Sequence, residues 1–278
     1  MIYLDGRLIA ERIKKELKEQ SVSRSHPLRL AIVSVGTNPV SEKFITLKEK
    51  FAHEIGVETR RYEFPETITT NELRNSMNDI VHEAHNDGVI VQLPLPSHID
   101  TQGVLNAIVP EKDVDVLSAR AVGNVQVGKS RILAPVAGAV KILFEEYSVS
   151  VKGAAAVVLG YGRLVGQPVA TWLISVGAQV TIVRDKAELN PAVTSSADII
   201  IAGMGNPRGV TGEYVKSGAA VIDVGTSESE GVIAGDVDID SVVEKAAFLT
   251  PLRGGVGPLT VAFVFKNLFT LVEGGRRG

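Results

Sequence analysis

The chain has 278 residues, of which 45% are apolar and 22% charged, and its formal net charge is −3. This composition is typical of a soluble globular protein, and the charge gives no support for binding to nucleic acid or to a membrane surface. The absence of cysteine excludes disulfides and thiolate metal sites, and it fits a cytoplasmic protein. We expect no signal peptide and no membrane-spanning segment, because no apolar run approaches the roughly 18–20 residues that a bilayer requires.

Strands and helices alternate along the first half of the chain. Helical spacing at residues 8–17 is followed by a strand at 29–36, and Asn38 and Pro39 then cap and open a helix that ends near Ile55. Further elements are predicted in the order strand, helix and strand, at residues 58–64, 69–87 and 89–91. A short helix followed by a polar loop is predicted within residues 100–118. This alternation predicts a parallel α/β sheet.

A second α/β block follows a connecting helix at residues 138–149. A strand at 154–160 leads through a glycine turn into a helix that closes at Gly177. Three more strands are predicted at residues 179–183, 197–203 and 219–225. The last helix, at residues 257–274, is amphipathic and could close this block or return to the first one.

The glycine turn is a candidate dinucleotide site. Gly160, Gly162 and Gly166 stand between a strand and a helix, where a pyrophosphate binds the N–H groups of the helix N-terminus. The spacing is one residue longer than the usual fingerprint, and a glycine-rich turn without a ligand is the alternative.

The end of the next strand bears on the choice of cofactor. An acid such as Asp185 favours the free ribose hydroxyl of NAD, whereas Arg184, with Arg163 and Lys186 nearby, favours the 2′-phosphate of NADP. Three cations outweigh one carboxylate, so we predict NADP, with NAD as the alternative.

Lys48 occupies an unusual position on the helix that ends at Ile55. Phe44, Phe51 and Ile55 are spaced for one apolar face, and Lys48 falls on that face. Its methylenes could extend the ammonium to solvent, which is the default for such a lysine. Alternatively the ammonium reaches into a cleft, where partial desolvation lowers its pKa and suits it to proton transfer.

Gln92 follows an unbroken apolar run at residues 89–91 and is followed by Pro94 and Pro96. Ligands of open parallel sheets bind beyond the carboxyl ends of strands, and the prolines restrict the backbone there. Gln92 is therefore a candidate site residue, with an exposed amide as the alternative.

Two loops carry further candidates. Asp113 and Asp115 are loop carboxylates, which are more often surface than site. The loop at residues 250–260 contains several glycines, which allow close approach of a ligand or form a plain tight turn.

In order along the chain, several strings resemble those of the bifunctional methylenetetrahydrofolate dehydrogenase/cyclohydrolase family. The most specific are QLPLP at residues 92–96, VIDVG at 221–225 and GGVGP-x-T at 254–260, supported by KDVDV and GDVD. The resemblance implies a two-domain α/β fold, with an N-terminal folate domain at residues 1–133, a Rossmann-type domain at 134–260 and a cleft between them. It also implies that the final helix, at residues 261–278, returns to the folate domain.

The resemblance further implies an enzyme of one-carbon metabolism. Such enzymes oxidise 5,10-methylenetetrahydrofolate to 5,10-methenyltetrahydrofolate with NAD(P)⁺, hydrolyse the product to 10-formyltetrahydrofolate, need no metal and usually form cytoplasmic homodimers. Carried over by position, the catalytic residues are Lys48, Gln92 and Asp115. The implied substrate-binding residues are Phe44, Pro94, Pro251, Gly254, Gly255 and Pro258. The implied cofactor-binding residues are Gly160, Tyr161, Gly162, Arg163, Val165, Arg184, Gly205 and Thr226.

The chain departs from the family pattern at several positions. Phe44 replaces a tyrosine, Val116 replaces the glycine after the pterin-binding aspartate, and Arg253 stands where proline is common. Residues 135–138 replace a P-C-T-P loop on the nicotinamide side, and Tyr161 stands in a turn that lacks the usual serine.

Three alternatives follow for the function. A monofunctional NAD-dependent dehydrogenase would not need Lys48, and an amino-acid or shikimate dehydrogenase would lack the QLPLP string. A non-catalytic folate or nucleotide binder is the third.

Overall fold

The computed structural model describes residues 1–225, 227–229 and 232–275. The chain divides into two compact units. The first unit comprises Ala10–Pro135 and Val261–Gly278, and the second comprises Met1–Ile9 and Val136–Thr260. The predicted two-domain α/β fold is thus observed, but the strand β1 (Ile2–Tyr3) belongs to the second unit, whereas the expected boundary placed it in the first.

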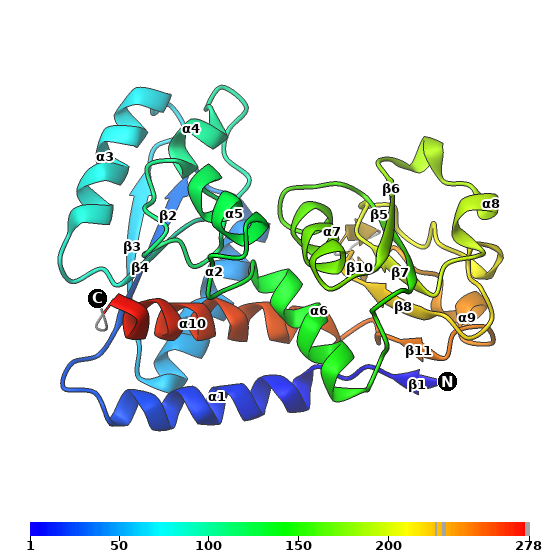
Figure 1. Ribbon diagram of the computed structural model, residues 1–278. Coiled ribbons are helices and arrows are strands. Elements are labelled where there is room, and N and C mark those ends of the chain that lie inside the picture. The colour runs from blue at the N-terminus through cyan, green and yellow to red at the C-terminus, as the bar shows by residue number, and fades with distance from the viewer. Residues whose placement is uncertain (226, 230–231, 276–278) are drawn as a thin grey trace. The chain divides into compact units, whose positions relative to one another are not determined.

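The first unit is built on a three-stranded parallel sheet of order β3-β2-β4 (Figure 1). Its strands are β2 (Arg29–Val35), β3 (Glu58–Phe64) and β4 (Gly88–Val91). Its helices are most of α1 (Arg7–Val22), then α2 (Pro39–Ile55), α3 (Thr70–His82), α4 (Thr101–Leu105), α5 (Ala119–Gln126) and most of α10 (Val256–Gly275).

The helix caps follow the sequence rules. Asn38 accepts hydrogen bonds from two N–H groups of the first turn of α2, and Gly56 ends that helix in the left-handed conformation. Thr69 and Glu72 form a reciprocal capping box at the start of α3. These contacts fix where α2 and α3 begin, as the sequence predicted.

The two faces of this sheet are covered by different helices. On one face, Ala31, Val33 and Val89 pack in a core with residues of α3 and α4. On the other, Leu268 of α10 lies so close to Gly88 that a Cβ there would stand 2.7 Å from it. The unbroken apolar run of β4 is explained because it is buried on both faces.

The second unit contains a six-stranded sheet of order β1-β11-β8-β7-β5-β6, parallel throughout (Figure 1). The remaining strands are β5 (Ala155–Leu159), β6 (Gln179–Val183), β7 (Ile199–Ala202), β8 (Ala220–Asp223) and β11 (Phe248–Leu249), with a separate hairpin of β9 (Ser227–Ser229) and β10 (Val232–Ala234). The helices are α6 (Pro135–Glu146), α7 (Gly166–Ser175), α8 (Pro191–Thr194) and α9 (Ile239–Val242), with short 3₁₀ turns η1 (Lys186–Glu188) and η2 (Gly212–Tyr214). The strand order reverses between β5 and β7, which defines a doubly wound sheet.

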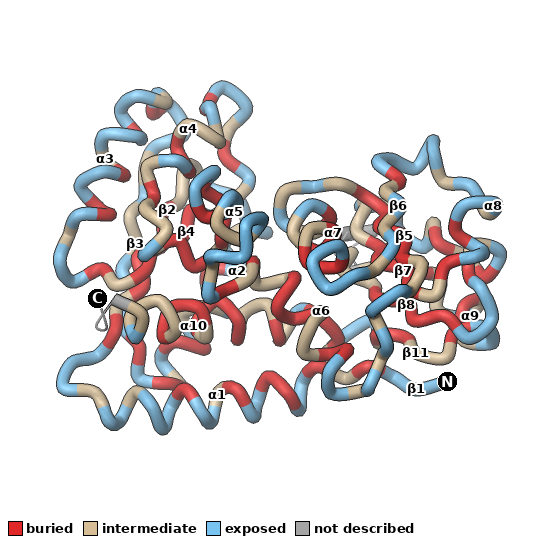
Figure 2. The backbone as a smooth tube through the Cα atoms, in the orientation of Figure 1, coloured by how far each residue is buried: buried red, intermediate tan, exposed pale blue. Residues whose placement is uncertain are grey.

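Helix α10 corrects the expectation about apolar runs. Among the described residues it is long and apolar enough to cross a membrane by length and composition. Half of that stretch is buried inside the protein, as Figure 2 shows for α10. Phe265 stacks on Phe51 of α2 at 5.2 Å between ring centroids, and buried Asn267 donates to the carbonyls of Val114 and Leu133. The apolar composition of α10 therefore reflects a core helix.

Candidate active site

Lys48 and Gln92 are in direct contact in the first unit. The Nζ of Lys48, from α2, donates to Oε1 of Gln92 at 2.9 Å. The Nε2 of Gln92 donates to the carbonyl oxygen of Leu93 at 2.9 Å, which turns the other end of the amide toward the lysine. Gln92 directly follows β4, at the carboxyl edge of the sheet where ligands of parallel sheets bind.

Burial changes the proton affinity of the charged groups around this contact. Burial lowers the pKa of half-buried Lys48, while the negative charge of Asp115 opposes that shift. Burial raises the pKa of Asp115 to about 6, with Lys48 opposing and Asp113 adding to the rise. The lysine is thereby brought closer to the range in which it can both accept and donate a proton.

The loop that carries Asp115 is held by buried contacts on both sides. The carboxylate of Asp113 is fully buried and accepts from the backbone N–H groups of Leu117 and Ser118. Val116 has a φ of 59°, a left-handed conformation that costs a β-branched residue about 1–2 kcal/mol. Its side chain is 5% exposed and packs in a small cluster with Ile132. Asp113 therefore has a structural role, and packing at Val116 offsets the loss of the family glycine.

Phe44 shares a face of α2 with Phe51 and Ile55, as predicted, but unlike them it is exposed. Its side chain is 39% exposed, whereas Ile45, Phe51 and Ile55 are buried. Since Lys48 follows Phe44 by four residues, both lie on one helix face, which only partly contacts the core. Phe44 is thus available for stacking on a ligand beside the lysine.

Pro94 is exposed, and the Leu93–Pro94 peptide bond is cis. The following Leu95 is buried in the core.

In the glycine turn of the second unit, the backbone leaves no room for a side chain at two of the three glycines, whereas the remaining one faces open space. A Cβ on Gly160 would stand 2.3 Å from the carbonyl oxygen of Gly203, and one on Gly166 would stand 2.0 Å from that of Gly160. A Cβ on Gly162 would meet no described atom within 4 Å. Packing thus explains the first and third glycines, whereas close approach of a ligand would explain Gly162.

The residues around this turn fit an anionic cofactor. The Nη1 atom of Arg163 is buried and has no hydrogen-bond partner among the described residues, so a phosphate oxygen would satisfy it. The guanidinium of Arg184 lies over the ring of Tyr161 at 5.4 Å, which brings two predicted cofactor residues together. Asp185 accepts from the N–H of Ala187 as the cap of η1, so its carboxylate is engaged locally.

The other predicted cofactor residues have varied positions. Val165 precedes α7, and its side chain lies against Gly203. Gly205 has a φ of 69° and donates its N–H to Asp236, a buried carboxylate that the sequence interpretation gave no role. Thr226 lies outside the described residues.

Four of the predicted substrate residues lie near the end of the chain and belong to the second unit, whereas Lys48 and Gln92 belong to the first. The four are Pro251, Gly254, Gly255 and Pro258. A Cβ on Gly6 would stand 2.1 Å from the carbonyl oxygen of Gly255, and Gly6 donates its N–H to Gly254. Gly6 therefore makes room for Gly255, and Gly254 makes room for the N-terminal segment, since a Cβ on Gly254 would stand 2.5 Å from Nε of Arg7. Arg253 is exposed, and residues 135–138 open α6, so they form a helical turn and not the expected loop.

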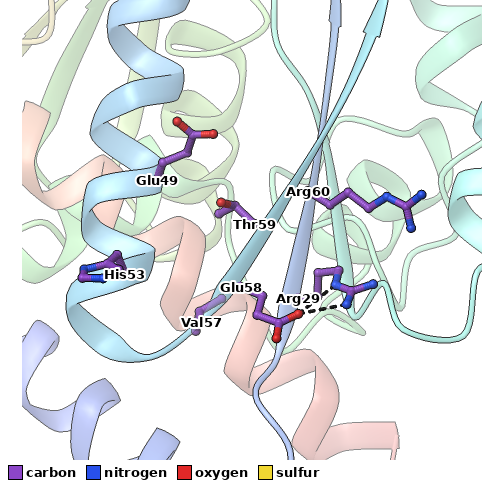
Figure 3. Close-up of a pocket in the computed structure, with 7 residues that line it drawn as sticks. All are labelled: Arg29, Glu49, His53, Val57, Glu58, Thr59 and Arg60. Atoms are coloured by element: carbon purple, nitrogen blue, oxygen red, sulfur yellow. Dashed lines mark hydrogen bonds and ion pairs between the residues drawn. The ribbon is translucent and has the colours of Figure 1, made fainter.

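A surface pocket of about 470 Å³ lies elsewhere on the first unit (Figure 3). It is lined by Arg29, Glu49, His53, Val57, Glu58, Thr59 and Arg60. Its charged groups are largely paired, since Arg29 binds Glu58 and Arg60 binds Glu83 outside the pocket. Arg29 and Glu58 begin β2 and β3, at the edge opposite to the carboxyl ends where Gln92 lies. We assign no catalytic role to this pocket.

A doubly wound sheet that carries an open glycine turn is the fold of dinucleotide-binding enzymes, and a lysine paired with an amide suits proton transfer. The model of the tetrahydrofolate dehydrogenase/cyclohydrolase catalytic domain matches residues 4–115, and the model of its NAD(P)-binding domain matches residues 134–275. The chain therefore belongs to the tetrahydrofolate dehydrogenase/cyclohydrolase family, and the predicted family, α/β fold and NAD(P) cofactor are confirmed.

Individual relatives agree with this assignment. The bifunctional protein FolD of Campylobacter curvus is 37% identical over 271 residues, which cover 96% of this chain and 94% of the relative. The crystal structure of the FolD dehydrogenase/cyclohydrolase of Campylobacter jejuni has a TM-score of 0.93 at 35% identity, with 99% of each chain covered. The FolD of Trypanosoma brucei, complexed with NADP cofactor and inhibitor, has a TM-score of 0.92 at 34% identity, covering 100% of this chain and 99% of that one.

Proposed function

We propose that the protein oxidises 5,10-methylenetetrahydrofolate to 5,10-methenyltetrahydrofolate with NADP⁺ and hydrolyses the product to 10-formyltetrahydrofolate. The 2.9 Å contact between Lys48 and Gln92 carries this proposal. A monofunctional dehydrogenase has no need of a desolvated lysine, because hydride transfer depends chiefly on alignment of the reacting carbons. When bound, the nicotinamide ring supplies the hydride acceptor.

Lys48 serves the hydrolytic step in two stages. Its amine removes one proton from a water molecule as the water oxygen bonds to the methenyl carbon. As the bond from that carbon to N5 of the folate breaks, the ammonium returns the proton to N5, and the remaining hydroxyl proton leaves to solvent. Gln92 holds the lysine in place, since Nε2 is fixed on Leu93 and Oε1 accepts from Nζ. The lowered pKa of Lys48 favours both directions of transfer.

Asp115 and Phe44 hold the folate in this proposal. The carboxylate of Asp115 accepts hydrogen bonds from the pterin ring, and its negative charge also moderates the fall in the pKa of Lys48. The exposed ring of Phe44 stacks on the folate beside Lys48, without the hydroxyl that the family tyrosine provides.

NADP is the preferred cofactor in this proposal. Arg184 and the buried Nη1 of Arg163 supply positive charge and donors for phosphate oxygens. Asp185 caps η1 and is less able to accept from a free ribose hydroxyl. Pro251, Gly254, Gly255 and Pro258 remain proposed substrate-binding residues.

The remaining predictions extend the proposal to the whole molecule. The protein is a homodimer and cytoplasmic, and its folate and cofactor domains divide near residue 133. Size-exclusion chromatography with light scattering tests the dimer, for which a mass near 29.6 kDa would indicate a monomer.

One assay tests both proposed activities. The protein is mixed with methylenetetrahydrofolate and either NADP⁺ or NAD⁺, while methenyl absorbance and reduced nicotinamide are followed separately. We expect faster reduction of NADP⁺, and hydrolysis of added methenyltetrahydrofolate without any nucleotide. Oxidation without hydrolysis would indicate a monofunctional dehydrogenase, and neither activity would indicate a binding protein.

A further inference from the structure

Two aspartates, buried Asp236 and half-buried Asp223, link the carboxyl ends of three strands in the second unit. Both stand in sequence strings, VIDVG and GDVD, that received no role above. Asp223 is the last residue of β8, and Asp236 follows the β9–β10 hairpin. Strands β7, β8 and β11 are neighbours in the sheet, so the loops that follow them lie at one edge (Figure 1). This edge is the one where a dinucleotide binds to a doubly wound sheet.

Asp236 holds the loop that follows β7. Its side chain is fully buried, and its Oδ2 atom accepts from the N–H groups of Met204 at 2.5 Å and Gly205 at 3.0 Å. Its Oδ1 atom accepts from the N–H of Asn206 at 2.8 Å. Three consecutive backbone donors are thus fixed by one carboxylate, and hydrogen bonds of this kind are stronger than those between neutral groups.

Asp223 holds Asp236 in turn. Its Oδ1 atom accepts from the N–H groups of Gly225 at 2.9 Å and Asp236 at 3.1 Å, and its Oδ2 atom accepts from Val237 at 3.0 Å. The N–H of Asp223 itself donates to the hydroxyl of buried Thr250 at 2.8 Å. The chain of contacts therefore runs from β11 through β8 to the loop after β7.

The glycines of the two strings are explained by these aspartates. A Cβ on Gly225 would stand 2.6 Å from Cγ of Asp236, and one on Gly235 would stand 1.9 Å from Oδ2 of Asp223. The glycine of VIDVG thus makes room for the aspartate Asp236 of GDVD, and the glycine of GDVD makes room for the aspartate Asp223 of VIDVG. The VIDVG and GDVD strings form one structural network.

The loop held by Asp236 lies against the glycine turn. The carbonyl oxygen of Gly203 and Cα of Met204 would stand 2.3 Å and 3.0 Å from a Cβ on Gly160. Gly203 also donates its N–H to Leu159, the last residue of β5. A shift of the loop would therefore move the backbone against which the turn packs.

We propose that Asp236 is a positioning residue for the dinucleotide: by fixing residues 204–206 it sets the wall of the cofactor site beside the glycine turn, and Asp223 fixes Asp236. The inference rests on the proposed function only in that NADP⁺ binds at this edge. None of the network belongs to the first unit, where Lys48 and Gln92 lie.

The test is Asp236→Asn, which replaces one accepting oxygen by an NH₂ group that faces backbone donors. Loss of a charge-assisted hydrogen bond typically weakens binding by about 10–100-fold. We expect the KM for NADP⁺ to rise at least about tenfold, with kcat at saturating NADP⁺ within about threefold of wild type. Hydrolysis of added methenyltetrahydrofolate needs no nucleotide, so it should stay within about twofold and report that the protein is folded.

Asp240→Asn is the matched control, because it removes the same charge from an 87% exposed side chain in the same segment. If the KM for NADP⁺ rises no more in Asp236→Asn than in this control, the proposal is overturned. It is also overturned if hydrolysis and NADP⁺ reduction fall together, because Asp236 would then only support the fold. Absence of NADP⁺ reduction in the wild type would instead refute the proposed function.

Asp223→Asn provides the test if Asp236→Asn does not fold. The amide oxygen of asparagine can keep the two contacts that Oδ1 of Asp223 accepts from Gly225 and Asp236, so only the contact from Val237 is lost. The same division between a raised KM for NADP⁺ and unchanged hydrolysis is expected, with a smaller rise because Asp223 acts through Asp236. A KM equal to that of wild type would overturn the link between the two aspartates.

Discussion

Replacing Lys48 with methionine separates the two activities most directly. The change keeps the helix and most of the methylene packing of α2, since methionine is a good helix former of similar length. It removes the titratable group that donates to Gln92 at 2.9 Å. The variant no longer pays the cost of burying the ammonium charge, but it leaves Oε1 of Gln92 without its hydrogen bond. Because these two effects oppose each other, we expect the free energy of unfolding to change by about 1 kcal/mol or less.

The expected effect on rate follows from the proposed role. Loss of general acid–base help typically lowers a rate by about 10²–10⁴-fold, and we expect this for hydrolysis of methenyltetrahydrofolate. Hydride transfer should suffer less, because it depends on alignment, so methenyltetrahydrofolate should accumulate when methylenetetrahydrofolate and NADP⁺ are supplied.

Methenyl absorbance measures both outcomes, and Lys50→Met provides the control. Lys50 lies on the same helix but is exposed, so its replacement should leave hydrolysis unchanged. If Lys48→Met hydrolyses added methenyltetrahydrofolate at the wild-type rate, the lysine only extends to solvent and the proposed mechanism is refuted.

Three further predictions concern cofactor choice, pH dependence and stability. Arg184→Ser should raise the KM for NADP⁺ about tenfold and that for NAD⁺ by less than threefold, because the charge-assisted contact is made only to the 2′-phosphate; equal losses in steady-state assays would show that Arg184 does not contact the phosphate. Burial raises the pKa of Asp115 to about 6, and the ionised carboxylate binds the pterin, so kcat/KM for both folate reactions should fall as pH drops below about 6. Asp115→Asn should abolish that inflection, and an unchanged pH profile in the variant would assign it to another group. Asn267→Leu leaves the carbonyls of Val114 and Leu133 unpaired, so the first unit should lose about 2–4 kcal/mol in denaturant titrations; a loss below about 0.5 kcal/mol would contradict this.

Much of the fold followed from local sequence signals. The cap at Asn38, the apolar strands and the glycine turn after β5 depend on residues that are neighbours in the chain, so their physical causes are visible in the sequence. The pairing of Lys48 with Gln92 could not be predicted from local signals. Forty-four residues separate them, and only the family resemblance and the rule on carboxyl ends of strands indicated that they would meet.

Other features were decided by the tertiary structure. Strand β1 has two residues, too few for a periodic pattern, and it is a strand only because β11 pairs with it. Phe44 is exposed although Phe51 and Ile55, seven and eleven residues later on the same helix face, are buried. Apolar spacing shows which residues share a face, but not where along the helix the covering core ends.

The sequence by itself determined the α/β class, the family and the residue types available for the chemistry. Only the tertiary structure decided which carboxylates hold backbone segments in place. Asp223 and Asp236 resemble any other aspartate in the sequence, yet each accepts backbone N–H groups from a segment that folding brings close to it. Long-range hydrogen bonds leave no periodic trace along the chain, so the positioning network became visible only in three dimensions.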